Sequence, residues 1–419
     1  MPGLARRLGT GDAVFIGLGS MIGAGVFSAF APAAAAAGSA LLVGLALAAG
    51  VAYCNAVASA QLAARYPSSG GTYVYGRARL GEWWGFAAGW SFVIGKTASC
   101  AAMALTFAAY AIPGSVWLQR GIAVVAVLAL TWVNLRGITR TATLARVLVL
   151  GSILSLVVFV GAALAGGHAD VRNLVGGDLP LGPYGVLQSA GLLFFAFAGY
   201  ARIATLGEEV RAPERTIPRA IPIALGITVV IYLLVGATAL LVAGPAALAA
   251  TTTPLATSLE VAGSAWSLPV VRAGAVVASL GALLALIAGI SRTALAMARE
   301  GDLPRWLAGV EPVHQVPARA QVAVAVAVIA LLAVADLRGA IGFSSFGVLV
   351  YYAIANAAAF TQPAEDRRWP RALNLVGLAG CFVLVATLPI TSMLTGLAIL
   401  AIGLVGRALV NRNHGDTPQ

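Results

Sequence analysis

Twelve apolar segments, each long enough to cross a lipid bilayer, follow one another along this chain of 419 residues. A membrane-spanning helix needs about 20 consecutive apolar residues. Only 10% of the residues are charged, against about 25% in soluble domains. The sequence therefore predicts an all-α polytopic membrane protein, a single transmembrane domain over residues 1–419. The segments are residues 11–37, 39–62, 83–112, 116–135, 146–166, 186–207, 219–243, 270–291, 319–335, 339–360, 372–389 and 391–409.

The basic residues are distributed unevenly between the two sides of these segments. With the N-terminus placed inside, 20 arginines fall on the inside and four on the outside, while Lys96 and Arg202 lie within segments. Cytoplasmic loops of membrane proteins are enriched in Arg and Lys. The bias predicts a multi-pass protein of the cytoplasmic membrane with both termini cytoplasmic. It also accounts for the net charge of +11 without a nucleic-acid partner. The polar tail, residues 412–419, is predicted to be disordered.

Catalytic motifs are missing from the sequence. It contains no G-x-S-x-G, no H-E-x-x-H and no pair of acidic residues in the middle of a segment. The GKT at residues 95–97 resembles the end of a phosphate-binding loop, but Trp90 stands where the first glycine is required. The three cysteines lie in apolar segments without metal-ligand spacing, so no metal and no other cofactor is expected. An enzyme is therefore not expected.

The first segment has a glycine pattern that favours an interrupted helix. GLGSMIGAG carries Gly17, Gly19, Gly23 and Gly25 within nine residues, and each glycine costs a helix about 0.8–1.0 kcal/mol relative to alanine. An unwound midpoint would direct free backbone amides at an anion, and a side chain at Gly25 would fill the space that the anion needs. Gly19-x-x-x-Gly23 is also a helix-packing pattern, so the run alone leaves both explanations open.

The sixth segment shifts the balance toward an interruption. It has Gly199 at its centre among aromatic residues and lies five segments after the first. The two segments run in opposite directions, as inverted repeats of five helices require. The repeats would span approximately residues 11–166 and 186–360, with two further helices within residues 372–409. Two interrupted helices at matching positions predict a substrate site near the middle of the membrane.

Four stretches resemble the amino acid–polyamine–organocation (APC) superfamily of permeases. The resemblance implies a LeuT-like fold, a five-plus-five inverted repeat with broken helices 1 and 6 plus two C-terminal helices. It also implies transport of amino acids by alternating access. The stretches are GSMIGAGVF (19–27), YPSSGGTYVYGRARLG (66–81), FFAFAGYARIATLGEEVRAPERTIPRAI (194–221) and ALAMAREGDLPRWL (294–307).

The resemblance also implies a set of substrate-binding residues. Backbone amides of the first segment would hold the substrate carboxylate, and backbone carbonyls of the sixth segment would accept from its ammonium group. Phe197 or Tyr200 would gate the site. The positions are Ser20, Met21, Ile22, Gly23, Ala24 and Gly25 in the first segment, and Phe195, Ala196, Phe197 and Ala198, with Gly199 and Tyr200 beside them, in the sixth.

Charged and hydroxyl residues within the segments are candidates for coupling. A cation in mid-membrane is costly and is treated as functional by default, which singles out Lys96, the only lysine, and Arg202. The structural explanations are snorkelling for Arg202, and neutral burial or pairing with carbonyls for Lys96. Proton-coupled members of the family carry a lysine on helix 5, where this chain has Ser152. Lys96 is our candidate replacement, because burial disfavours its charged form. Ser152 and Ser291 together mark either a vestigial sodium site or ordinary inter-helix hydrogen bonds.

The sequence thus predicts a secondary active transporter of amino acids, working by proton-coupled symport. Neutral substrates are favoured, because the third and sixth segments have no mid-segment acid to pair with a cationic side chain. Exchange, acidic substrates and a non-transporting amino acid receptor or scaffold are the alternatives. The expected partners are an amino acid, protons and the lipid bilayer, and the sequence does not indicate an oligomeric state.

Overall fold

The computed structural model describes residues 8–67, 70–137, 142–175, 180–207 and 209–415. Over these ranges the chain forms helices and no strand. Ten helical stretches are long and apolar enough to cross a membrane, and Ala318–Val334 and Arg371–Thr387 are shorter apolar helices. The predicted all-α membrane fold is confirmed, and all twelve predicted segments correspond to helices.

The chain order follows the expected five-plus-five arrangement. Each set of five spans begins with a broken helix, and two more helices follow the second set. The first set is α1 (Thr10–Met21), α2 (Ala24–Ser28) and α3 (Phe30–Ala37), then α4 (Leu41–Arg65), α6 (Glu82–Ala111), α7 (Val116–Leu135) and α8 (Ala142–Ala165). The second set is α10 (Gly182–Phe197) and α11 (Ala201–Ala204), then α12 (Pro213–Ala249), α14 (Leu268–Arg299), α15 (Ala318–Val334) and α16 (Leu337–Phe360), followed by α17 (Arg371–Thr387) and α18 (Ile390–Gly415).

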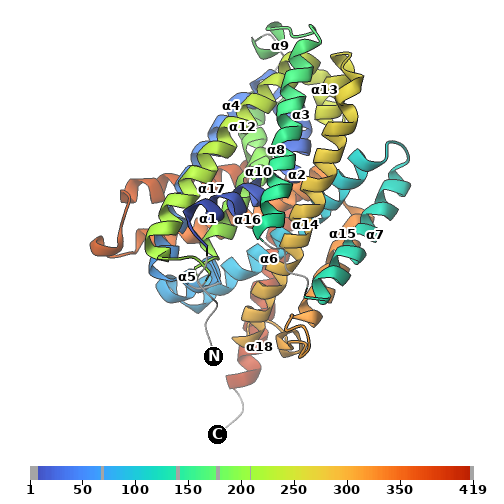
Figure 1. The fold of residues 1–419 in the computed structure, drawn as a ribbon. Helices are drawn as coiled ribbons and strands as arrows, with labels where there is room; N and C mark the ends of the chain where they lie inside the picture. The colour runs from blue at the N-terminus through green and yellow to red at the C-terminus, as the bar shows by residue number, and fades with distance from the viewer. Residues whose placement is uncertain (1–7, 68–69, 138–141, 176–179, 208, 416–419) are drawn as a thin grey trace.

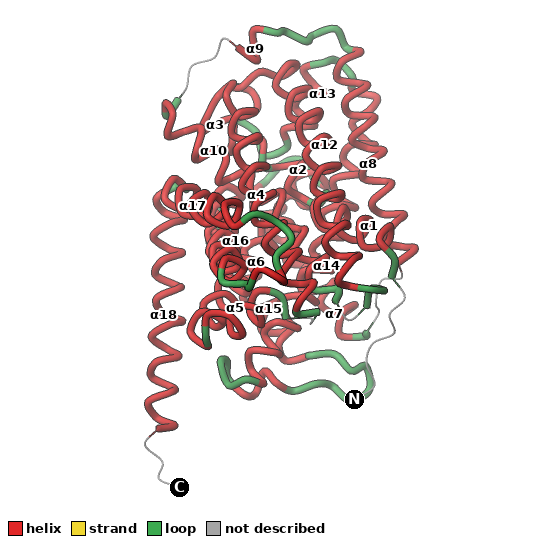
Figure 2. The backbone as a smooth tube through the Cα atoms, turned by 90° about the vertical axis from the view of Figure 1, so that its left-hand side faces the viewer, coloured by secondary structure: helices red, strands yellow, loops and turns green. Residues whose placement is uncertain are grey.

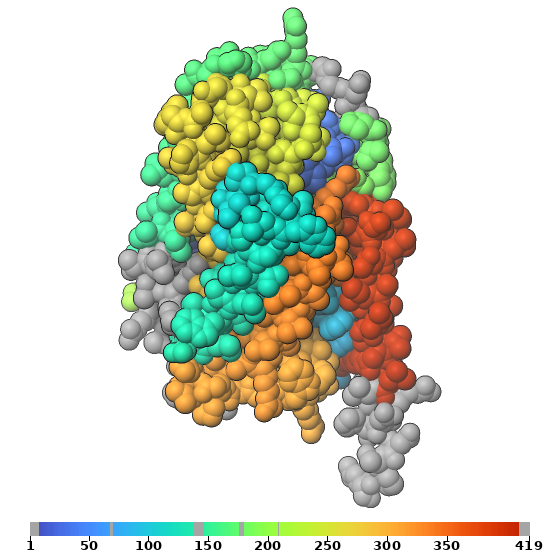
Figure 3. All heavy atoms as spheres, turned by 90° about the vertical axis from the view of Figure 1, so that its right-hand side faces the viewer, coloured from blue at the N-terminus to red at the C-terminus, as the bar shows by residue number. Residues whose placement is uncertain are grey.

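Helix α6 lies at the centre of the bundle, packed along both α14 and α16. Glycines allow this close approach: a Cβ at Gly347 of α16 would lie 2.7 Å from the Gly95 Cα of α6. Helices in membranes associate through such small residues, because lipid offers no hydrophobic driving force between helices. Helices α7 and α18, by contrast, are the least buried of the long spans and lie on the surface of the bundle (Figure 3). The central helices therefore provide the rigid surroundings of the site described below.

The two ends of the bundle carry different short helices. Helices α9 (Arg172–Val175) and α13 (Pro254–Val261) lie at one end, and α5 (Thr72–Leu80) and the C-terminal part of α18 lie toward the other (Figures 1 and 2). We call the end with α5 and the end of α18 the terminal face. The sequence does not predict α5, α9 or α13, because each is too short to show a periodic pattern.

One boundary differs from the prediction at the C-terminus. Helix α18 continues to Gly415, so residues 412–415, expected to be disordered, are helical. Helical hydrogen bonding extends past the apolar run because each added residue of a formed helix gains a bond at little cost. Residues 416–419 of the predicted tail lie outside the described residues.

Candidate functional site

The first membrane-spanning helix is broken at its middle. Helix α1 ends at Met21 and helical backbone resumes at Ala24. Ile22 (φ −77°, ψ 64°) and Gly23 (φ −110°, ψ −142°) both lie outside the helical region. The first amides of a helix have no partner within it, so the break leaves the amides after Gly23 available. The interruption expected from the glycine run is present.

The sixth span is interrupted less abruptly. The α-helical backbone of α10 changes to a 3₁₀ turn at Ala198–Tyr200, and α11 then ends at Ala204. A 3₁₀ stretch inside a helix redirects the carbonyls of the preceding turn. The Tyr232 hydroxyl of α12 lies 2.5 Å from the Met21 carbonyl oxygen and 3.0 Å from that of Ala196. This hydroxyl joins the two interruptions.

Glycines bring the two broken helices into backbone contact. A Cβ at Gly199 would lie 2.2 Å from the Ser20 carbonyl oxygen, and a Cβ at Gly25 would lie 2.6 Å from the Cα of Ala196. Gly25 was expected to leave room for a carboxylate, whereas a side chain there would first enter α10. The glycines therefore serve close packing as well as the break, and the two explanations of the pattern do not exclude each other.

A cavity of about 610 Å³ lies beside the two interruptions. Helices α6 and α14 complete its wall with Phe92, Met103, Ala282 and Leu286, which are apolar, and with Lys96 and Ser99, which are polar. The expected site residues that line this cavity are Ser20, Met21, Gly23, Gly25, Phe195, Ala196, Ala198 and Gly199. The geometry therefore places a mixed polar and apolar pocket where the sequence predicted a substrate site.

Lys96 points across this cavity from α6 to the 3₁₀ turn. Its side chain is only 6% exposed, and its Nζ donates to the Ala198 carbonyl oxygen at 3.2 Å. The Tyr352 hydroxyl donates to the same oxygen at 3.4 Å. Pairing with a carbonyl, one of the two explanations offered for Lys96, is thus the arrangement observed. It also means that a carbonyl expected to bind substrate already accepts from this chain.

The expected gating residues lie elsewhere. Phe197 packs against Tyr232 with ring centroids 5.1 Å apart, and Tyr200 stacks on Tyr352 at 4.9 Å. Both rings are fully buried and, like Ala24, line neither this cavity nor the smaller one described next. The aromatic rings that do face the cavity are Phe92 and Phe195.

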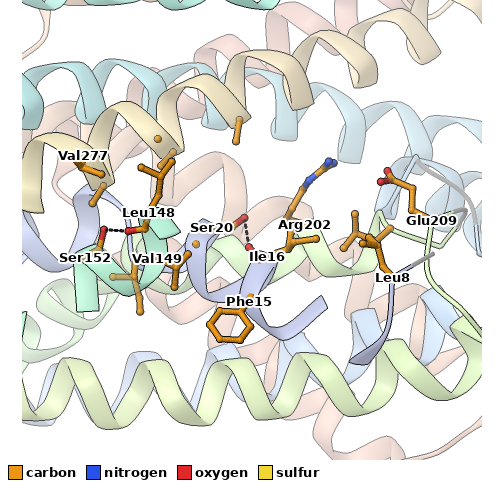
Figure 4. Close-up of a pocket in the computed structure, with 17 residues that line it drawn as sticks. Leu8, Phe15, Ile16, Ser20, Leu148, Val149, Ser152, Arg202, Glu209 and Val277 are labelled. Atoms are coloured by element: carbon orange, nitrogen blue, oxygen red, sulfur yellow. Dashed lines mark hydrogen bonds between the residues drawn. The ribbon is translucent and has the colours of Figure 1, made fainter. Parts of the chain in front are cut away.

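A smaller cavity of about 240 Å³ lies between α1, α8 and α14 (Figure 4). Ser20, Ile22 and Ser152 line it, but Ser291 does not. Each serine hydroxyl bonds to its own helix, Ser152 to Leu148 at 2.8 Å and Ser291 to Ile287 at 2.6 Å. The structure does not bring Ser152 and Ser291 together. In the described part of the chain, no group of three or more His, Cys, Asp or Glu residues could hold a metal ion.

The larger cavity extends toward the terminal face. Arg202, Thr205, Glu209, Arg292 and Thr293 line it toward the terminal face. On the opposite side the break is covered, since the Tyr110 hydroxyl donates to the Phe27 carbonyl oxygen at 2.7 Å and accepts from the Leu255 amide of α13 at 3.3 Å.

Comparison with known sequences shows which protein family this chain belongs to. Residues 8–409 match the amino acid permease family. The chain belongs to that family. An uncharacterized transporter of Mycobacterium tuberculosis (strain ATCC 25618 / H37Rv) is 58% identical over 99% of this chain and 94% of its own. This permease is also similar to the branched-chain amino acid permease of Bacillus subtilis (strain 168), 27% identical over 99% of this chain and 95% of that one.

Another relative is the vacuolar cationic amino acid transporter 4 of Arabidopsis thaliana, 28% identical over 83% of this chain and 62% of that one. These matches indicate a membrane transporter of amino acids rather than an enzyme.

The sequence did not predict the cavity residues of α6 and α14, apart from Lys96. No hydropathy pattern marks these residues, because the lipid-facing and the buried sides of a spanning helix are both apolar.

Proposed function

We propose that this permease moves neutral, apolar amino acids across the cytoplasmic membrane by proton-coupled alternating access, with the terminal face inside. The cavity between the two interrupted helices is the observation that carries the proposal. It places free amides, carbonyls and apolar side chains around one space of about 610 Å³. An amino acid needs all three: donors for its carboxylate, acceptors for its ammonium group and an apolar wall for its side chain.

The backbone supplies the two polar ends of this site. The amides that follow Gly23 face the substrate carboxylate and are supported by the positive end of the resumed helix. Carbonyls of Phe195 to Ala198 are the acceptors for the ammonium group. Because Ala198 and Ala196 already accept from Lys96, Tyr352 and Tyr232, substrate binding has to share or displace these bonds.

The part of the cavity that would contact the substrate's side chain favours an apolar amino acid. Phe92, Met103 and Leu286 line this part of the cavity. Among the described residues, three cations (Lys96, Arg202 and Arg292) and one acid (Glu209) line the cavity. This excess of positive charge opposes the entry of arginine or lysine. The branched-chain substrate named for the Bacillus subtilis relative agrees with this preference, and the cationic one named for the Arabidopsis thaliana relatives does not.

Lys96 is the residue that we propose carries the coupling proton. Its ammonium group bridges α6 to the 3₁₀ turn through Ala198. A conformational change that moves the turn away from α6 removes this acceptor from a buried charge, and a buried charge without a partner is unfavourable. Proton release in one conformation and uptake in the other would then link transport to a proton gradient. The second candidate is an acidic amino acid whose side-chain carboxylate pairs with Lys96.

Uptake into proteoliposomes tests the proposal directly. Purified protein is reconstituted with an imposed pH gradient, and uptake of labelled leucine, glutamate and arginine is compared with that into protein-free vesicles. We expect saturable, gradient-driven leucine uptake. Preferential glutamate uptake would favour the acidic alternative, leucine uptake only against internal leucine would identify an exchanger, and saturable binding without uptake would identify a receptor. Tight arginine binding would contradict the specificity argument.

A further inference from the structure

The terminal-face end of the larger cavity carries a cluster of charged and hydroxyl groups that the central site does not use. Its members are Arg202, Thr205, Glu209, Arg292 and Thr293, and we call it the cationic mouth. Arg202 and Glu209 also line the smaller cavity, at the end opposite Ser152 (Figure 4). The two cavities thus meet partly at the mouth, and they also share Ser20, Ala282 and Ala285.

Among the residues that the structure describes, the mouth carries more positive than negative charge. Within the described residues, neither Arg202 nor Arg292 has an ion pair. The Arg202 guanidinium donates a hydrogen bond to the Thr205 hydroxyl at 3.3 Å. Arg202 and Arg292 both line this cavity. Guanidinium groups bind carboxylates through charge-assisted hydrogen bonds, so an anion held in the mouth would be stabilised by them.

We propose that the cationic mouth is a second binding site, one that takes the carboxylate of the amino acid substrate between the central site and the terminal face. Arginine binds a carboxylate through two parallel hydrogen bonds. Glu209, the acid at the mouth, has the charge that pairs with the ammonium group of the same molecule. The identity of the ligand rests on the proposed function, whereas the anion site itself does not.

The size of the cavity leaves room for this second site. Pockets for drug-sized ligands have volumes of about 300–1,000 Å³, so about 610 Å³ is more than one small amino acid needs. The charged residues of the mouth lie on α14 and at the end of the sixth span, and the break in α1 does not contribute to it. A substrate held at the break and one held at the mouth would thus use different polar groups, and the amino acid can pass from one set to the other.

Malonate, a dicarboxylate without an ammonium group, is the probe for the anion site. Its affinity for the purified full-length protein is measured by thermal shift. Arg292→Gln should weaken malonate binding by at least about tenfold, as expected when a charge-assisted pair is lost. Arg299→Gln is the matched control: it removes the same charge from the exposed end of the same helix, outside both cavities, and should leave the affinity unchanged. Arg202→Lys, which keeps the charge, should weaken binding less than Arg202→Gln.

Glu209→Gln separates an anion site from a site for the whole amino acid. Removing this carboxylate should strengthen malonate binding and weaken binding of the transported amino acid, measured as competition with malonate. Equal malonate affinity in Arg292→Gln and Arg299→Gln would overturn the anion site. Malonate binding that no transported amino acid displaces would overturn its place on the substrate path. If the protein takes up no amino acid but loses malonate binding in Arg292→Gln, the proposed function fails and the anion site stands.

Discussion

Replacing Gly199 with alanine should separate the two interrupted helices and weaken substrate binding. An added Cβ would lie 2.2 Å from the Ser20 carbonyl oxygen, 2.3 Å from the Ser20 carbonyl carbon and 2.6 Å from the Met21 nitrogen. These are backbone atoms at the end of α1, so no side-chain rotation relieves the overlap. The 3₁₀ turn and the break have to move apart.

The size of the effect follows from these distances. An ordinary contact begins at 3.4 Å, so the Ser20 oxygen and the new Cβ must separate by about 1.2 Å. Overpacking of a close-packed interior costs about 1–3 kcal/mol. A displacement of about 1 Å between groups that must act together is enough to reduce function about 100-fold. We therefore expect substrate affinity to fall by about one to two orders of magnitude while the helices remain inserted.

Binding and folding are measured separately to test this. Substrate affinity is determined by scintillation proximity on purified protein, and folding by its melting temperature and elution from size exclusion. Gly226→Ala is the matched control, because Gly226 lies in the interior of α12 with no atom within 4 Å of an added Cβ, and alanine there should be neutral or stabilising by about 0.5–1 kcal/mol. Unchanged substrate affinity in Gly199→Ala would refute the argument that the site depends on this backbone contact.

Three other experiments test the role of the glycine run, the role of Lys96 and the orientation in the membrane. Gly25→Leu should abolish substrate binding without preventing membrane insertion, because its side chain would enter Ala196 of α10; binding at wild-type affinity would reduce the glycine run to a tolerant packing motif. Lys96→Met should leave substrate exchange intact and make uptake insensitive to an imposed pH gradient, whereas a specific loss of acidic-substrate binding would support the acidic alternative, and no change in either would make the lysine structural. A reporter fused to the C-terminus should be active only in the cytoplasm, since the basic residues divide 20 to four, and activity on the outer face would reverse the orientation.

Much of the fold could be predicted from the sequence because lipid imposes a strong local rule. A spanning helix must satisfy its own backbone hydrogen bonds and be apolar over about 20 residues, so each span is visible in a short window. Helix α7, predicted at residues 116–135, is observed over the same range. The break at Gly23 was predictable for a similar reason, since helix propensity is a local property. The short helices α5 and α13 were not predictable, because neither has the length to show a pattern.

The composition of the site depended on tertiary contacts. The sequence identified the broken segments, but only packing decided that Phe92 and Leu286 face them while Phe197 and Tyr200 turn toward Tyr232 and Tyr352. The sequence also identified Lys96 as unusual, and only the structure placed its Nζ on the Ala198 carbonyl oxygen. The physical reason is that hydropathy measures how each residue partitions into lipid, which is the same on every side of a helix in an apolar bundle. Which side meets a neighbour is decided by steric fit between helices far apart in the chain, such as the contact of Gly199 with Ser20.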